Sequence, residues 1–139
     1  MITSTSNAQI KELAKLQKKS RLRDEKGIFL VEGPRMTEEI PAERIEKVYA
    51  SESFAKKNKE FLEKLQAPVE LLTDTVFAYV SDTKTPQGIL AIVKRLNYTM
   101  NDLMQMKNQK APHLVVLDNL QDPGNLGTIF RTAEAAGVT

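Results

Sequence analysis

The 139-residue sequence has no cysteine and only one histidine, His113. The absence of cysteine excludes disulfide bonds, thiol nucleophiles and cysteine-ligated zinc. One histidine excludes a histidine metal cluster and argues against a Ser-His-Asp triad. No apolar run approaches the roughly 20 residues that span a bilayer, and the N-terminus lacks the apolar core of a signal peptide. We therefore expect a cytoplasmic protein without a metal site or a membrane partner.

What the sequence does contain is an ordinary globular composition with an uneven charge distribution. Apolar residues make up 41% and charged residues 27%, and the net charge is +2. The first 26 residues nevertheless carry seven basic and three acidic side chains. A basic end of this kind suits a phosphate-binding face, or is simply the solvated face of a helix. Charge alone leaves both interpretations open.

Short β-prone runs alternate with helical patterns over the first 96 residues. The runs are bounded by glycine, proline or polar turns, and the helical segments carry apolar residues three and four apart. This alternation predicts an α/β domain whose apolar strands are covered on both faces. Strands are expected at residues 27–33, 45–50, 69–72 and 88–93, and helices at residues 8–19, 35–40 and 52–65.

Local signals set the expected ends of these elements. Asn7 is a suitable N-cap for the first helix, and either Ser51 or Ser53 for the third. Asp74 is expected to cap a further short helix. The charged stretch at residues 21–26 is interpreted as a loop.

The composition changes at residues 97–112, which are polar and rich in methionine. This segment is predicted to be a linker with one helical turn near residues 102–106. A methionine cluster can also pack against a partner surface, although a flexible connector is the simpler interpretation.

A second α/β unit is expected to begin at residue 113. An apolar strand at residues 114–117 leads through a loop into a helix that starts at Gly124 or Asn125 and stops before Gly137. One strand and one helix cannot bury both of their faces, so this unit is expected to be incomplete.

The stretch with chemical content is DPGNLGTIFRTAEAAG, which starts at Asp122. A helix that begins after a glycine-containing loop presents free amides and a positive dipole end to an anion. Asn125 lies at this helix mouth, and Arg131 follows six residues later, where it is expected to project from nearly the same side. Together they could hold a phosphodiester and its neighbouring sugar hydroxyl. Taken singly, a capping Asn and a surface Arg explain them as well.

Two other phosphate-binding motifs are excluded for this stretch. No Gly-Lys-Ser/Thr follows the glycines, so this is not a nucleoside-triphosphate loop. The spacing of Gly124 and Gly127 also differs from the G-x-G-x-x-G dinucleotide pattern. These glycines could equally permit close packing of the helix on the strand.

Taken together, the string closely resembles the first conserved motif of the SpoU (TrmH) family of RNA ribose 2′-O-methyltransferases, within the SPOUT superfamily. A second set of motifs resembles that family's N-terminal substrate-binding domain. These are ITSxxNxxIKxLxKL from Ile2, GIFLVEGPR from Gly27 and TPQGILAIV from Thr85. Both sets occur in the family's order and cover nearly the whole chain.

The resemblance implies a compact α/β/α substrate-binding domain at residues 1–96, like that of kink-turn-binding ribosomal proteins. It implies a linker at 97–112 and the start of a knotted SPOUT methyltransferase domain at 113–139. Asn125 and Arg131 match the family's active-site positions. The implied partners are RNA, with ribosomal RNA favoured over transfer RNA, and a second copy in a homodimer. RNA-binding side chains are expected among Lys11, Lys18, Lys19, Arg21, Arg23 and Arg35.

The family uses S-adenosylmethionine, which it binds with two further motifs that form a knot. Neither motif occurs in these 139 residues. The chain is therefore expected to be the first part of a longer protein, inactive alone and without a cofactor-binding residue of its own. Two alternatives stay open, a stand-alone RNA-binding module and an inactive fragment. Glu32 is interpreted as a structural hydrogen-bonding group, and the three tyrosines are too scattered for a base-stacking platform.

Overall fold

The computed structural model describes residues 1–105 and 111–138. The chain divides into two compact units, Met1–Arg95 and Leu96–Thr139. The first unit contains the whole of the sheet and nearly all of the buried apolar side chains. The described residues of the second unit form two helices.

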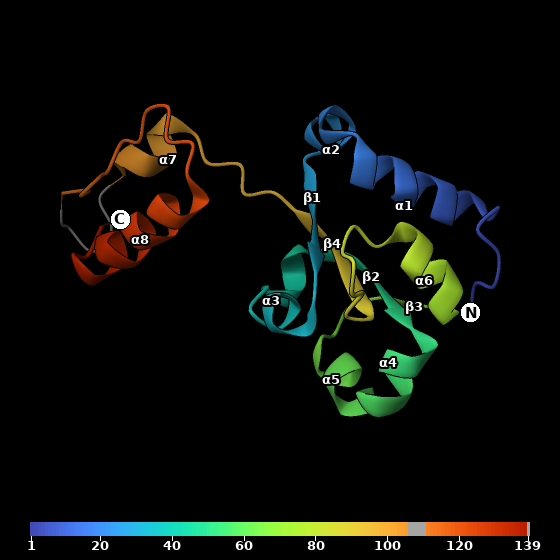
Figure 1. Ribbon diagram of the computed structural model, residues 1–139. Coiled ribbons are helices and arrows are strands. Elements are labelled where there is room, and N and C mark those ends of the chain that lie inside the picture. Colours follow the sequence, from blue (N-terminus) through green and yellow to red (C-terminus); the bar gives the residue numbers. More distant parts are fainter. Residues whose placement is uncertain (106–110, 139) are drawn as a thin grey trace. The chain divides into compact units, whose positions relative to one another are not determined.

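A four-stranded mixed sheet forms the centre of the first unit (Figure 1). Its spatial order is β1-β4-β2-β3, with β4 antiparallel to both neighbours and β2 parallel to β3. All four strands fall where the sequence predicts them, and the predicted α/β class is confirmed. The strands are β1 (Ile28–Glu32), β2 (Ile45–Ser51), β3 (Val69–Leu72) and β4 (Ile89–Lys94).

Helices cover both faces of this sheet. Since successive residues of a strand point to opposite sides, each strand contributes side chains to both faces. On β4, Leu90 and Ile92 join one apolar cluster, whereas Ile89 and Val93 join the other. The first cluster is completed by α1 (Ala8–Lys18), α2 (Ser20–Lys26) and α6 (Asp74–Val80). The second is completed by residues around α3 (Pro34–Glu38), the short 3₁₀ helix η1 (Ala42–Arg44), α4 (Glu52–Lys57) and α5 (Lys59–Lys64).

The charged stretch at residues 21–26 is a helix, α2, and its interpretation as a loop is wrong. Its residue types are good helix formers, and Arg21 pairs with Glu25 one turn later at 3.0 Å. Gly27 ends the helix in the left-handed conformation, with φ of 63°. Leu22 packs against the core, so the helix gains tertiary contacts that composition alone does not indicate.

Two further predictions on helices need correction. The single helix expected over residues 52–65 is two helices, because Asn58 leaves the helical conformation and its side chain donates to Phe54 O at 3.0 Å. Ser51, one of the two predicted caps, accepts from Phe54 N. Helix α6 is capped by Thr73 rather than Asp74, whose carboxylate instead accepts from Ser53 N at 3.2 Å.

In the second unit, α7 (Met100–Met104) and α8 (Pro123–Ala135) are the helices of the described residues. Residues 106–110 of the predicted linker, and Thr139, lie outside the described residues. The expected strand at residues 114–117 is irregular, and Val116 is 89% exposed. A strand needs a neighbour to accept its backbone hydrogen bonds, and no described segment pairs with this one.

Neither a membrane-spanning helix nor a group of metal ligands occurs among the described residues. None of their helices is long and apolar enough to cross a membrane. No group of three or more potential metal-ligating His, Cys, Asp or Glu side chains occurs among them.

Candidate nucleic-acid interface

Helix α1 is fixed on the sheet by its apolar side and leaves its basic side exposed. Ile10, Leu13 and Leu16 are at most 2% exposed and lie in the core. Asn7 caps the helix by accepting from Gln9 N at 2.9 Å, as predicted. The first turn is therefore well defined.

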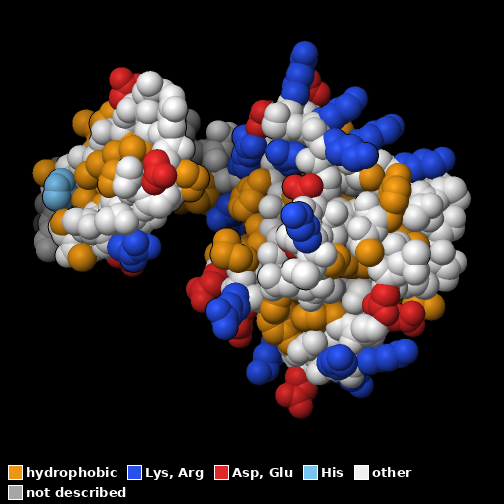
Figure 2. Space-filling model, in the orientation of Figure 1, with side chains coloured by type: hydrophobic (Ala, Val, Ile, Leu, Met, Phe, Trp, Pro, Cys, Tyr) orange, Lys and Arg blue, Asp and Glu red, His pale blue; other side chains and the backbone are white. Residues whose placement is uncertain are grey.

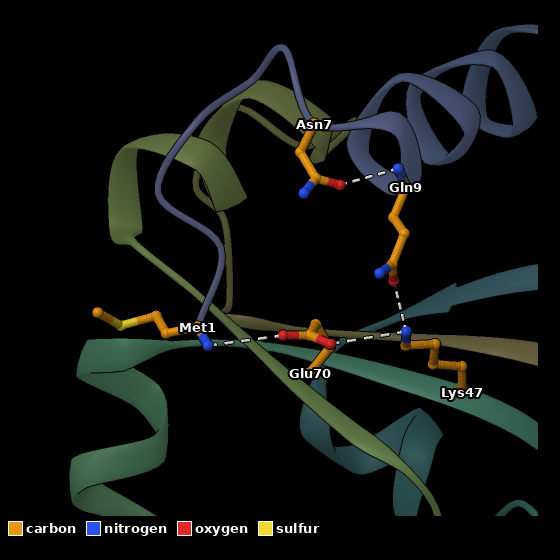
Figure 3. A network of polar contacts seen from close by, with 5 residues as sticks. All are labelled: Met1, Asn7, Gln9, Lys47 and Glu70. Carbon is orange, nitrogen blue, oxygen red and sulfur yellow. Dashed lines mark hydrogen bonds and ion pairs between the residues drawn. The ribbon is translucent and has the colours of Figure 1, made fainter.

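A polar network also ties the start of α1 to the sheet (Figure 3). Lys47 Nζ on β2 donates to Gln9 Oε1 and lies 3.7 Å from Glu70 Oε2 on β3. The other oxygen of Glu70 lies 3.7 Å from the amino group of Met1. The backbone of Ile2 adds a parallel bridge to Leu72. The N-terminal segment is thereby bound to the edge of the sheet, which holds α1 in one orientation.

Four exposed lysines lie along α1 and at its C-cap, and we call them the α1 lysine face: Lys11, Lys15 and Lys18 on the helix, and Lys19 as the cap. In residues 1–105 and 111–138, none of them forms an ion pair. Figure 2 shows Lys and Arg side chains gathered along α1 and α2. Lysines near the end of α1 also oppose the negative end of the helix dipole, so part of their role is structural. Their exposed ammonium groups can still contact phosphates.

The basic side chains of α2, unlike those of α1, form hydrogen bonds and ion pairs with other described residues. Arg23 Nη1 donates to the carbonyl oxygens of Leu16 and Gln17, so this guanidinium closes the end of α1. Lys26 Nζ lies 2.8 Å from Glu12 Oε1 and joins the two helices. Arg21 is 91% exposed despite its pair with Glu25. Between the helices lies a groove of about 700 Å³, lined by Ala8, Lys11, Glu12, Lys15, Lys19, Arg21, Leu22, Glu25 and Lys26.

Arg35 does not join this surface. It is exposed on α3, which follows β1, whereas Lys26 of α2 precedes β1 (Figure 1). Five residues of strand span roughly 16 Å, so the two helices lie at opposite ends of β1. The structure therefore gathers five of the six predicted RNA-binding residues, Lys11, Lys18, Lys19, Arg21 and Arg23, and leaves Arg35 apart.

Two residues of this surface were not among the predicted RNA-binding residues. Lys15 stands four residues from both Lys11 and Lys19, a spacing that places all three on one side of a helix and could have identified it. Tyr79 of α6 lies beside the lysines, in a small hollow of about 260 Å³ that also involves Ala14. Nothing in the sequence indicates that α6 packs next to α1.

The Glu12–Lys26 pair gives a prediction for pH dependence. The hydrogen bond from Lys26 lowers the pKa of Glu12 below 4.5, and the same bond raises the pKa of Lys26 above 10.5. The stabilising contribution of Glu12 is thus present above pH 4.5 and is lost as the pH falls through its lowered pKa. We expect the protection factors of the α2 amides, which correct for the intrinsic slowing of exchange in acid, to fall below pH 4.5. Glu12→Gln should show faster exchange already at about pH 7 and a weaker acid response; an identical acid response would contradict this role.

Glu32, at the end of β1, is a structural hydrogen-bonding group, as interpreted from the sequence. Its Oε1 accepts from Ser81 Oγ at 2.7 Å and from Thr83 Oγ1 at 2.9 Å. The other oxygen, Oε2, is buried and has no hydrogen-bond partner among the described residues. The carboxylate ties the loop before β4 to β1. It lies next to Gly33, whose φ of 107° is a backbone conformation that residues with a side chain rarely adopt.

In the second unit, the start of α8 carries the other predicted residues. The helix begins at Pro123, and Asp122 caps it by accepting from Asn125 N at 2.6 Å, so the predicted start at Gly124 or Asn125 is late by one or two residues. The Asn125 side chain is thus not the cap, and it is exposed. Gly137, with φ of 71°, follows the end of the helix as predicted.

Arg131 reaches back along α8 toward Asn125. Six residues of helix turn by about 600°, so these two residues start about 120° apart rather than on nearly the same side. Thr128 lies between them, and Arg131 Nη2 donates to Thr128 Oγ1 at 3.2 Å. The Arg131 guanidinium also passes over Gly127, where a Cβ atom would stand 3.6 Å from Nη1. Thr128 therefore directs the guanidinium toward the helix start, a role the sequence did not indicate.

The described residues of the second unit do not fit S-adenosylmethionine by themselves. Cofactor sites are concave and enclose most of their ligand. Asn125 and Arg131 are both exposed, and the apolar residues at 114–117 are open to solvent instead of forming a wall.

Comparison with known proteins identifies the first unit. Residues 7–91 match the family described as MRM3-like substrate binding domain. The chain is 32% identical over 140 residues to the 23S rRNA (guanosine(2553)-2′-O)-methyltransferase RlmP of Bacillus subtilis, covering 99% of this chain and 51% of that protein. It is 34% identical over 130 residues to the human mitochondrial rRNA methyltransferase 3, covering 86% of this chain and 29% of that protein.

Solved structures agree with this relationship. An rRNA methyltransferase from Sinorhizobium meliloti superimposes with a TM-score of 0.70 at 26% identity, covering 99% of this chain and 51% of that one. The same comparison with its AdoMet-bound form gives a TM-score of 0.69. The chain thus spans about half the length of the bacterial relatives that it matches. It belongs to the SpoU (TrmH) family, with residues 7–91 as an MRM3-like substrate-binding domain.

Proposed function

We propose that this protein serves in the transfer of a methyl group from S-adenosylmethionine to a ribose 2′-hydroxyl of ribosomal RNA. The observation that carries the proposal is the α1 lysine face on a domain of the MRM3-like substrate-binding type. The named function of relatives such as RlmP supports ribosomal RNA as the substrate class. The proposed ribosomal RNA substrate leads us to propose a cytoplasmic location as well. The family resemblance leads us to propose a homodimer.

In this proposal residues 1–96 recruit the RNA. Phosphates are held mainly by Lys and Arg side chains, which position a nucleic acid without reading its sequence. The α1 lysine face provides four exposed ammonium groups, three on α1 and one at its C-cap. Arg21 extends the surface, whereas Arg23 contributes by holding α2 against the end of α1.

The start of α8 has the second role. A ribose hydroxyl is a poor nucleophile, so holding it in the reacting geometry provides much of the rate. Arg131 presents a planar fork of donors that suits a phosphate or the charge developing beside it. Thr128 orients that fork, and Asn125 offers a side-chain amide in the first turn of α8. When bound in the protein, S-adenosylmethionine would supply the methyl group.

Deletion of the native gene, followed by mapping of ribose 2′-O-methyl groups in total RNA, tests this function. We expect one methyl group to disappear from ribosomal RNA and to return when the wild-type gene is restored. Loss from transfer RNA alone would contradict the ribosomal substrate. An unchanged methylation map would contradict the enzymatic proposal and would favour the stand-alone RNA-binding module.

A further inference from the structure

A small hollow beside α1 combines an exposed aromatic ring with the α1 lysine face. Its volume is about 260 Å³, and its lining is Lys11, Ala14, Lys15, Lys18, Lys19 and Tyr79. The neighbouring side chains of α6, Val76, Phe77 and Val80, are at most 2% exposed and form the core. Tyr79 is instead 55% exposed, so the core does not need its ring.

The lining has the chemistry of a nucleotide site. Tyr79 and Ala14 supply apolar surface, and the other four lining residues are lysines. Glu12 and Glu25 line the adjacent α1–α2 groove, but within the described parts of the chain no carboxylate lines this hollow. A ligand with a flat, apolar centre and negatively charged edges would match both the apolar surface and the lysines. An unpaired base flanked by two phosphates in an RNA strand has that form, because such bases stack on aromatic rings.

We propose that this hollow binds one unpaired nucleobase of the RNA by stacking on Tyr79, while the α1 lysines hold the flanking phosphates. The proposal rests on the proposed function, in that RNA is the ligand, and adds that the RNA is bound at an unpaired nucleotide. The other two tyrosines do not compete for this role. Tyr49 is buried in the sheet at 4% exposure, and Tyr98 belongs to the second unit.

The test uses the 139-residue chain and two RNA hairpins. One hairpin carries a single bulged adenosine, and the other carries an abasic ribose at the same position. Tyr79→Ala should weaken binding of the bulged-adenosine hairpin by roughly 5-fold or more, the lower limit for loss of one stacked base. It should leave binding of the abasic hairpin unchanged, and Tyr79→Phe, which keeps the ring, should bind like the wild type.

Other outcomes separate this inference from RNA recruitment itself. If Tyr79→Ala binds both hairpins as the wild type does, the stacking proposal is overturned while recruitment by the lysines stands. Equal weakening for both hairpins also overturns it, since the ring would then act through the shape of the lysine face. If polyglutamate competes as well as the hairpin, the hollow is an acidic-peptide site and not a nucleobase site. Because Tyr79 is exposed, the variants should melt at the wild-type temperature.

Discussion

Arg131→Ala in the native gene is expected to remove the same ribosomal 2′-O-methyl group that is lost on deletion of the gene. Loss of one positioned donor at a developing charge typically lowers a catalytic rate by about 10²–10³-fold. Arg131 is exposed and its guanidinium donates to Thr128 on the same helix, so the substitution should not disturb the fold. Arg131→Lys keeps the charge but not the planar fork, and we expect it to be strongly impaired as well.

A control on the same helix distinguishes a role in the reaction from a general effect on α8. Glu134→Gln changes another exposed side chain of α8 and should leave the methylation level unchanged. Thr128→Val keeps the size of the side chain but removes the hydroxyl that orients Arg131, so an intermediate loss is expected, with recovery in Thr128→Ser. Full methylation in cells that carry Arg131→Ala would contradict the assignment.

Neutralising the α1 lysine face is expected to have a similarly large effect, on RNA binding. The variant carries Lys11→Gln, Lys15→Gln, Lys18→Gln and Lys19→Gln. Without these four ammonium groups at the phosphates, binding should weaken by on the order of 10²–10³-fold at about 0.1 M salt. Glutamine keeps the helical propensity of lysine, and the lysine side chains lie on the solvent side of α1, so the helix should remain folded.

The chain offers a matched control with the same change of charge. Four lysines line a separate surface on α4 and α5: Lys56, Lys57, Lys59 and Lys64. Two of them already pair with glutamates, Lys56 with Glu52 and Lys59 with Glu63. Neutralising these four changes the net charge of the protein equally. If long-range attraction by net charge explained binding, both variants would weaken it to the same extent.

Much of the fold could be predicted from the sequence where local patterns decide structure. The strands are short apolar runs between turns, and because this sheet buries both of its faces, such runs identify its strands directly. Helix α2 was not predicted because a short run of charged residues is also typical of a loop, although most of its residues favour a helix. What makes it a helix is the packing of Leu22 and the pair between Lys26 and Glu12, and both depend on the position of α1.

The candidate site shows the same division between local and tertiary information. The lysines of α1 follow from helical spacing, but Tyr79 is distant from them in the sequence, and only the packing of α6 brings it to them. Arg35 was grouped with the basic residues by charge, and the position of α3 beyond β1 separates it. The strand expected at residues 114–117 depends on hydrogen bonding to another strand, which no local pattern can supply.

The central claim, that the α1 lysine face recruits RNA through phosphates, is tested most directly by the salt dependence of binding to one RNA hairpin. For the wild-type chain, the logarithm of the affinity should fall steeply with the logarithm of salt concentration. Each phosphate that a lysine neutralises adds roughly 0.7–0.9 to this slope, so neutralising the α1 lysine face should reduce it by about 3. The α4–α5 variant should keep the wild-type slope. Equal slopes for the wild type and the α1 variant would contradict the account.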